Sequence, residues 1–268
     1  MHETAYAKIN LALHVRERMA DGYHRIETVF AFAEDGDRLS VVEGEGLTLA
    51  ITGPFAAGLA GEGDNLVLRA ARALRERSGV EAGARLTLDK RLPIASGIGG
   101  GSADAAAALR LLTRWWHLDA NEADLFDIAA TLGADLPACL LSRFARGEGK
   151  GDALHPLPDQ GLAGTPLLLA NPGRALPTAA VFNAWDGVDR GALGDWRQGR
   201  NDLQRPASGL VPEIGAVLEA LSEANFTRMS GSGATCFGLY ATVGERDAAA
   251  SSIAARHPDW WILASQLR

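Results

Sequence analysis

The sequence has few cysteines and no long hydrophobic run. Its two cysteines, Cys139 and Cys236, are too few for a disulfide framework or a tetrahedral zinc site. We therefore expect both to be buried reduced thiols. No apolar run approaches the roughly 18 residues that a membrane span needs, and residues 1–8 lack the charged-then-apolar order of a signal peptide. These absences predict a cytoplasmic protein that does not bind membranes.

The chain also lacks an excess of positive charge. Its net charge of −7 argues against a nucleic-acid partner, which needs a basic surface. The six histidines show no metal-ligand spacing, so no residue is assigned to a metal. With 47% hydrophobic and 22% charged residues, the chain can bury a substantial core. Its 268 residues allow one large domain or two modest ones.

Apolar patterns predict a mixture of strands and helices without the even βαβ rhythm of a doubly wound sheet. The expected strands cover residues 8–15, 26–32, 37–42, 47–51, 85–89, 167–170, 235–240 and 260–263. Helices are expected over 64–79 (with Asp64 as cap and Gly79 at the end), 121–133, 178–185 and 245–256. Two more are expected to begin near residues 102 and 135, and another is expected to end near residue 225. This mixture predicts an α+β protein. Glycine, proline and charged residues accumulate at 147–164, so we place a domain boundary there and predict domains 1–152 and 153–268.

A glycine-rich segment, residues 93–102, is the most informative stretch. Four glycines between 97 and 101 remove side chains where backbone N–H groups could approach an anion. The helix that follows would direct its unpaired N–H groups and positive dipole end to the same place. Ser102 either caps this helix or reaches a metal-bound phosphate, and Asp104 in the first turn suits the dipole. The spacing matches neither a Walker A nor a Rossmann loop; a linker or tight turn is the alternative.

Three charged or polar residues occupy unusual positions in apolar segments. Lys8 and Asn10 share the polar face of the first strand, which is either a solvent-facing edge or a place to counter the charge of phosphoryl transfer. Asp135 lies among apolar residues, where a carboxylate is costly unless it is paired. It is either a helix N-cap, a catalytic group, or both.

Two loops offer further recognition chemistry. Tyr23 and His24 follow a turn and provide a stacking ring and a hydrogen-bonding ring, which suit a flat base but also pack hairpins. Residues 230–234 form a second run of small residues between a helix and a strand. This run is either a plain turn or an anion-binding backbone nest that faces the first glycine loop.

The ordered motifs resemble those of the GHMP small-molecule kinase family. Residues 7–11, 93–107 and 229–234 match three family blocks in the family's order. Residues 20–24, 63–66, 89–93, 132–137, 171–178 and 200–203 extend the match over nearly the whole chain. Within the family, these motifs most resemble members that phosphorylate a cytidine diphosphate-linked methylerythritol.

This resemblance implies an N-terminal ATP-binding α/β domain and a C-terminal ferredoxin-like domain. It implies transfer of the γ-phosphoryl group of ATP, with Mg²⁺, to the 2-hydroxyl of that small-molecule substrate on the methylerythritol phosphate route to isoprenoid precursors. Asp135 matches the family's catalytic aspartate and Lys8 matches its partner lysine. The expected protein is a monomer or a homodimer.

The resemblance also implies two sets of binding residues. Tyr23 and Phe182 match the rings that sandwich cytosine, and His24 matches the residue that hydrogen-bonds the base. The substrate set is Asn10, Tyr23, His24, Thr178 and Phe182. The ATP set is Asn65, Lys90, Pro93, Ala95, Ser96, Gly97, Ile98, Gly99, Gly100, Gly101 and Ser102.

Three other functions remain open from the residues alone. Another GHMP kinase, acting on homoserine or mevalonate, would be indifferent to cytidine. A non-catalytic nucleotide-binding module would tolerate the loss of Asp135. A dehydrogenase is disfavoured because the Rossmann spacing is missing. The charged loop at residues 147–152 is given no role.

Overall fold

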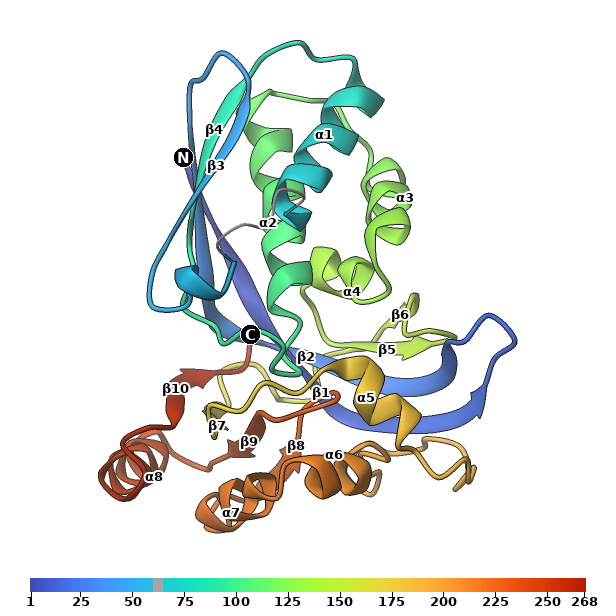
Figure 1. Ribbon diagram of the computed structural model, residues 1–268, viewed down its shortest axis with the longest axis vertical. Helices are drawn as coiled ribbons and strands as arrows, with labels where there is room; N and C mark the ends of the chain where they lie inside the picture. The colour runs from blue at the N-terminus through green and yellow to red at the C-terminus, as the bar shows by residue number, and fades with distance from the viewer. Residues whose placement is uncertain (60–64) are drawn as a thin grey trace. The chain divides into compact units, whose positions relative to one another are not determined.

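The computed structural model describes residues 1–59 and 65–268 (Figure 1). The chain divides into two compact units, and each unit is assembled from three separate stretches. Unit 1 comprises Met1–Ala7, Asp35–Ile94 and Gly99–Ser142, and unit 2 comprises Lys8–Glu34, Ala95–Ile98 and Arg143–Arg268. The first two strands and the glycine-rich loop therefore contribute to both units. The domain boundary between residues 152 and 153 stays a prediction.

Unit 1 contains a sheet with helices on one side (Figure 1). The C-terminal part of β2 (His24–Val42) pairs antiparallel with β4 (Ala84–Asp89), and β4 pairs parallel with β3 (Leu47–Thr52). Alternation in β4 buries Leu86 and Leu88 completely. The helices are α1 (Leu66–Ser78), α2 (Gly100–Trp115), α3 (Glu122–Leu132) and α4 (Leu136–Leu141), and a 3₁₀ turn, η1, covers Ala56–Leu59.

Two helices of unit 1 show how local sequence sets their ends. Helix α1 begins after Asn65, whose side chain accepts the N–H of Val67, and ends at Gly79 with a φ of 68°. Asp64, the predicted cap, lies outside the described residues. Helix α2 begins at Gly100, two residues before the predicted start, after Gly99 with a φ of 65°. Its alanines are buried, and their small side chains let neighbouring helices approach closely.

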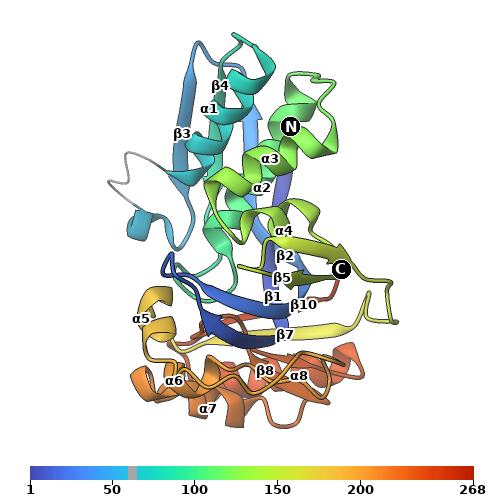
Figure 2. The same ribbon diagram turned by 90° about the vertical axis from the view of Figure 1, so that its right-hand side faces the viewer.

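Unit 2 contains an antiparallel four-stranded sheet in the order β10-β7-β9-β8. Its strands are β7 (Pro166–Asn171), β8 (Phe226–Met229), β9 (Cys236–Leu239) and β10 (Trp261–Gln266). The helices are α5 (Thr178–Asn183), α6 (Gln204–Leu210), α7 (Glu213–Ala220) and α8 (Val243–Arg256). Helices α7 and α8 cover one face of the sheet (Figures 1 and 2). The fourth-first-third-second strand order is ferredoxin-like, as predicted.

Some predicted elements differ from those in the structure. The strands expected at residues 26–32 and 37–42 form the single 19-residue strand β2, which follows β1 (His2–Arg18). The stretch at 147–164, where no strand was predicted, holds most of a hairpin, β5 (Ala145–Glu148) and β6 (Ala153–Pro156), and β5 pairs with β2. The one helix expected before residue 225 is two, because α6 ends before Pro212.

Both cysteines are buried and lie outside any disulfide, as the composition predicts. Burial raises the pKa of the Cys236 thiol, because a thiolate has no water to solvate it there. Among residues 1–59 and 65–268, no helix is long and apolar enough to cross a membrane.

Candidate active site

The predicted site residues fall into two groups, one in each unit. Unit 1 holds Asn65, Lys90, Pro93, Gly99, Gly100, Gly101, Ser102 and Asp135. Unit 2 holds Lys8, Asn10, Tyr23, His24, Ala95, Ser96, Gly97, Ile98, Thr178 and Phe182.

The glycines of unit 1 form the start of α2. The N-cap is Gly99, which has no side chain to accept the first-turn N–H groups. Those groups and the positive end of the helix dipole therefore suit an anion. Ser102 lies inside the first turn and does not cap the helix, so the capping interpretation of Ser102 was wrong. Asp104 lies one residue beyond the first turn and is buried, so its predicted place at the helix end was also wrong.

Lys90 is held inside unit 1 by two carboxylates. Its Nζ donates to Asp37 Oδ2 at 2.5 Å and to Asp104 Oδ2 at 2.6 Å, and the three side chains are at most 3% exposed. Burial alone would lower the pKa of Lys90, but Asp104 and Asp37 together raise it. Burial raises the pKa of Asp104 to about 8, opposed by Lys90 and reinforced by Asp37. The Lys90 ammonium is therefore hydrogen-bonded to two carboxylates of its own unit.

Asn65 and Asp135 are both helix N-cap residues, but only the Asn65 side chain makes a capping hydrogen bond. Asn65 Oδ1 accepts the Val67 N–H at 2.9 Å, so part of its amide is used locally. Asp135 precedes α4, yet its side chain makes no capping hydrogen bond. Pro137 in the first turn has no N–H to offer, which removes one usual partner of a cap. The N-cap position predicted for Asp135 is therefore confirmed, and its side chain is half-buried.

In unit 2, the polar face of β1 is buried. Lys8 and Asn10 are 3% and 1% exposed, so the solvent-facing alternative was wrong. Lys8 Nζ donates to Asn10 Oδ1 at 3.0 Å, and Asn10 Nδ2 donates to Thr28 Oγ1 at 2.8 Å. Thr28 in turn donates to the Ala12 carbonyl oxygen at 2.6 Å. This chain of hydrogen bonds fixes the direction of the ammonium, and sequence reasoning missed Thr28.

The two small-residue loops of unit 2 contact each other directly. Ser230 Oγ donates to the Gly97 carbonyl oxygen at 3.0 Å and accepts the Asn10 N–H at 3.2 Å. The Thr235 N–H donates to the carbonyl oxygen of Ser96 at 3.2 Å. Residues 230–234 therefore face the first glycine loop, as predicted, for its part in unit 2, residues 95–98; that they form an anion-binding nest stays a prediction.

This contact leaves no room for a side chain on Gly97. A Cβ there would lie 2.5 Å from the Ser230 carbonyl oxygen and 2.7 Å from the Gly233 nitrogen. Gly97 also has a φ of 77°, in the left-handed region. Across the contact, a Cβ on Gly231 would lie 2.6 Å from the Gly97 carbonyl oxygen. The glycines are therefore required by packing as well as by backbone conformation.

His24 lies in an aromatic cluster. Its ring centroid is 4.8 Å from that of Phe182 and 5.7 Å from that of Trp185, which meets it edge-on. Burial, followed by the charge of Arg18, lowers the pKa of His24, so the ring is neutral at neutral pH. Arg18 Nε donates to His24 Nε2 at 3.4 Å, which assigns the ring proton to Nδ1. Trp185 was not predicted, because its partner is distant in sequence.

Tyr23 is 55% exposed and has a different partner. The ammonium of Lys150 lies 4.1 Å from the centroid of its ring and 2.8 Å from Asp21 Oδ2. The Asp21 carboxylate also accepts the Tyr23 N–H at 3.0 Å. Lys150 belongs to the loop at residues 147–152, to which sequence reasoning assigned no role. The structure thus brings Phe182 against His24, and Lys150 against Tyr23.

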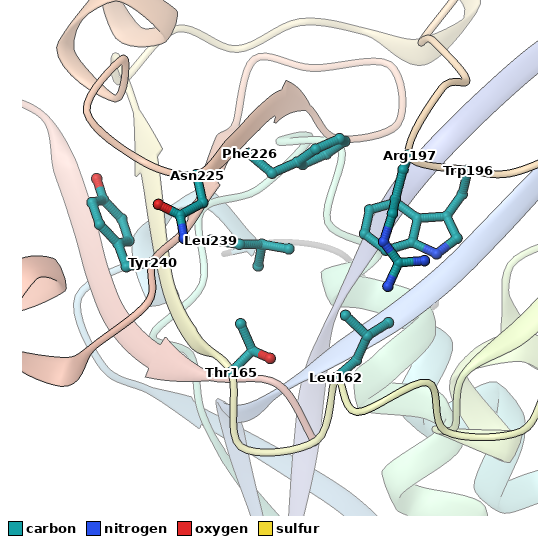
Figure 3. Close-up of a pocket in the computed structure, with 8 residues that line it drawn as sticks. All are labelled: Leu162, Thr165, Trp196, Arg197, Asn225, Phe226, Leu239 and Tyr240. Carbon is teal, nitrogen blue, oxygen red and sulfur yellow. The ribbon is translucent and has the colours of Figure 1, made fainter.

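Thr178 begins helix α5, and its hydroxyl lies 3.0 Å from that of Ser232. Thr178 therefore adjoins the second small-residue loop. A separate pocket of about 390 Å³ lies elsewhere in unit 2 (Figure 3). None of the predicted site residues lines this pocket. Its lining residues are Leu162, Thr165, Trp196, Arg197, Asn225, Phe226, Leu239 and Tyr240.

Two family models match this chain. "GHMP kinases N terminal domain" matches residues 65–143, and "GHMP kinases C terminal" matches residues 180–261. A solved structure titled 4-(cytidine 5'-diphospho)-2C-methyl-D-erythritol kinase superposes with a TM-score of 0.85 at 34% identity, covering 100% of this chain and 99% of the other. A mevalonate kinase structure superposes with a TM-score of 0.73 at 10% identity, covering 100% and 99%, which shows the shared fold.

Curated relatives cover the whole chain. The 4-diphosphocytidyl-2-C-methyl-D-erythritol kinase of Rhizorhabdus wittichii is 55% identical over 100% of this chain and 96% of its own length. The protein of the same name from Sphingopyxis alaskensis is 49% identical over 100% of this chain and 99% of its own. With matches of this extent in sequence and fold, the chain belongs to the GHMP kinase family, among the 4-diphosphocytidyl-2-C-methyl-D-erythritol kinases.

Proposed function

We propose that the protein transfers the γ-phosphoryl group of ATP to the 2-hydroxyl of 4-diphosphocytidyl-2-C-methyl-D-erythritol, a step in making isoprenoid precursors. The observation that carries this proposal is the 55% identity, over the full chain, to a kinase named for that substrate. The buried histidine with two aromatic neighbours supports it, because a flat, hydrogen-bonding base suits such surroundings. The cytoplasmic location and the choice between monomer and homodimer stay predictions.

In this proposal Asp135 is the group that receives the proton. A free carboxyl group has a pKa of about 3.9, far below that of an alcohol, so it does not deprotonate the hydroxyl beforehand. The loose transition state of phosphoryl transfer does not require that. Asp135 therefore orients the hydroxyl and accepts its proton late. The N-cap position of Asp135 supports this role, because it holds this residue at a defined place at the start of α4.

We assign Lys8 to the negative charge that develops during transfer. Its buried ammonium has lost most of its water and is aimed by Asn10, so its charge acts in a fixed direction. The backbone N–H groups at the start of α2 and the glycine loop would hold the phosphates. The second loop, residues 230–234, would support the first through the Ser230 hydrogen bond.

The donors present fit a magnesium ion that arrives with ATP. Within the described residues no three His, Cys, Asp or Glu side chains cluster as a metal site. Mg²⁺ in kinases is usually held by one or two protein oxygens plus the nucleotide phosphates, so a small donor set is enough. The Ser102 hydroxyl, which does not cap α2, is a suitable oxygen in unit 1. Bound there, Mg²⁺ would neutralise phosphate charge.

The cytidine base is assigned to the cluster around His24. The neutral ring carries its proton on Nδ1, which makes it a donor to an acceptor atom of cytosine. Phe182 and the exposed ring of Tyr23 would provide the apolar faces. Lys150 covers one face of Tyr23, so we assign the stacking to the opposite face.

One assay tests the proposed function. The protein is incubated with ATP, Mg²⁺ and a panel of acceptors containing the cytidine substrate, homoserine and mevalonate, and the products are identified by mass spectrometry. We expect one added phosphate on the cytidine substrate alone. Phosphorylation of homoserine or mevalonate instead would assign a different GHMP kinase activity. The absence of any phosphorylated product would contradict kinase activity.

Replacing Tyr23 by alanine should weaken binding of the cytidine substrate. Stacking of a base on an aromatic ring contributes about 1–3 kcal/mol, which corresponds to about 5- to 150-fold in Kd. Calorimetric titration with CDP measures the change, and the Kd for ATP should stay within about twofold. Tyr23→Phe is the matched control, because it keeps the ring. An unchanged CDP affinity in Tyr23→Ala would remove Tyr23 from the site.

Substrate affinity should also fall at acidic pH. The pKa of His24 is lowered by burial and by Arg18, so the neutral ring prevails at and above its ordinary value of about 6.5. As pH falls from 6.5 toward the lowered pKa, the unfolded chain binds this proton more readily than the folded one, so native stability decreases. Below the lowered pKa the folded ring gains a charge beside Arg18, and base recognition decreases. We expect the KM for the cytidine substrate to be flat from pH 8 to 6.5 and to rise below. His24→Gln should lack this rise, whereas a midpoint above pH 6.5 would contradict the assignment.

A further inference from the structure

We propose that Asp37, Lys90 and Asp104 form a positioning triad that fixes both ends of the phosphate-binding loop. The inference rests on the proposed function in one respect, that this loop holds the phosphates of ATP. Lys90 is therefore assigned as a positioning residue, and its ammonium is not assigned as a ligand of the nucleotide base.

The triad joins the chain that enters the loop to the chain that leaves it. Lys90 directly follows β4 and precedes the loop, whereas Asp104 belongs to α2, whose N-terminus ends the loop. One ammonium bridges the two, at 2.6 Å to Asp104 and 2.5 Å to Asp37 on β2. The bridge therefore fixes the separation of the two loop ends against the sheet.

Backbone contacts extend this restraint toward the loop itself. Asp37 Oδ1 accepts the N–H groups of Arg91 and Leu92, at 2.5 and 2.8 Å, which fixes the two residues before Pro93. At the other end, a Cβ on Gly100 would lie 3.1 Å from Lys90 Nζ, so the first turn of α2 packs on the ammonium. Both ends of the loop thus contact the triad.

The charges of the triad fit a positioning role better than a stabilising one. Three buried ionisable side chains cost desolvation in their charged forms, and well-packed apolar residues are often as stable or more so. Asp104 Oδ1 is buried without a hydrogen-bond partner among the described residues, a further cost. The raised pKa of Asp104 agrees with that cost. Short hydrogen bonds with fixed directions provide the defined geometry that an apolar cluster lacks.

The test compares variants that break or keep the bridge. Asp104→Ala removes the acceptor on α2 and leaves the balanced Lys90–Asp37 pair in place. Asp104→Asn keeps an oxygen acceptor and nearly the same shape. Asp89→Asn changes a carboxylate in the same segment that pairs with the Arg91 side chain and lies outside the triad. The Kd values for ATP, for inorganic tripolyphosphate and for CDP are measured by calorimetric titration.

We expect Asp104→Ala to raise the Kd for tripolyphosphate and for ATP by the same factor, about tenfold, because both bind through the loop. The Kd for CDP should stay within about twofold. Asp104→Asn and Asp89→Asn should stay near the wild type for all three. Tripolyphosphate has no base, so an unchanged tripolyphosphate Kd in Asp104→Ala would overturn the proposal.

Lys90→Met provides a second test, and thermal unfolding of each variant checks its fold. Parallel losses of ATP and tripolyphosphate affinity support positioning, whereas a loss for ATP alone would make the ammonium a base ligand and overturn the proposal. If Lys90→Met does not fold, the comparison of Asp104→Ala with Asp104→Asn still tests the proposal. The titrations need no phosphate acceptor. A failure of the proposed kinase activity would show in the mass-spectrometric assay instead, and the two failures stay distinguishable.

Discussion

Replacing Asp135 by asparagine is expected to lower kcat by about 10²- to 10⁴-fold, the range typical of a positioned proton acceptor. Asparagine keeps the size of the side chain but cannot accept the proton of the hydroxyl. The Kd values for ATP and CDP should stay within about twofold, because Asp135 is assigned to the reacting hydroxyl alone. Single-turnover kinetics and calorimetric titration measure the two quantities.

The matched control for Asp135 is Asp127→Asn, which changes an exposed carboxylate on α3 of the same unit. Its side chain is 74% exposed and lies 3.8 Å from Arg77, so its loss should cost little. Near-normal turnover in Asp135→Asn would show that the proton leaves by another route. A large loss in Asp127→Asn would show that kcat responds to charge in unit 1 generally.

Replacing Gly97 by alanine is expected to lower the free energy of unfolding by about 2–4 kcal/mol, from overpacking and from strain at a positive φ. The added Cβ would lie within 3 Å of Ser230 and Gly233 backbone atoms, so the two loops must separate. Because the same loop is assigned to the phosphates, the Kd for ATP should rise at least about tenfold. Denaturant unfolding and calorimetric titration measure these changes.

Gly215→Ala controls for the effect of adding a methyl group in unit 2. Gly215 lies in α7, and outside its own helix no heavy atom of the described residues lies within 4 Å of the position that its Cβ would take. Alanine should therefore stabilise the helix by up to about 1 kcal/mol. Equal stability of Gly97→Ala and wild type would mean that the loops separate at no cost. In that case the contact between them would not hold the loop in place.

Helices whose ends carry a local sequence signal, such as a capping residue or a terminal glycine, were predictable from the sequence. Helix α1 ends at Gly79 as predicted, because a glycine there adopts a left-handed conformation without strain. Helix α8 has its capping box between Thr242 and Glu245, so it begins close to the predicted start. In each case the signal and the structure lie within one turn of each other.

Elements that depend on distant partners were not predictable. The polar run around Gly36 resembles a turn, but a Cβ on Gly36 would lie 1.8 Å from the Ala5 carbonyl oxygen. This glycine therefore marks a close contact within unit 1 and does not interrupt β2. Likewise, β5 is only four residues long, and its pairing partner in β2 includes Thr28, 119 residues before Gly147. No local pattern encodes such a pairing.

The same distinction holds for the candidate site. The glycine loop, Lys8 and Asp135 stand out because their residue types are unusual in their segments. Their partners do not: Asp37 lies 53 residues from Lys90, and the fold alone brings the two together. The clusters around Trp185 and Lys150 arise in the same way, from tertiary packing.

The two buried thiols offer a way to follow each unit separately. Cys139 lies in unit 1 and Cys236 in unit 2, and neither is more than 1% exposed. An alkylating reagent such as iodoacetamide can reach either sulfur only when its surroundings open. The rate of carbamidomethylation at each position, measured by peptide mapping, would therefore report how often each unit opens locally, without an engineered cysteine.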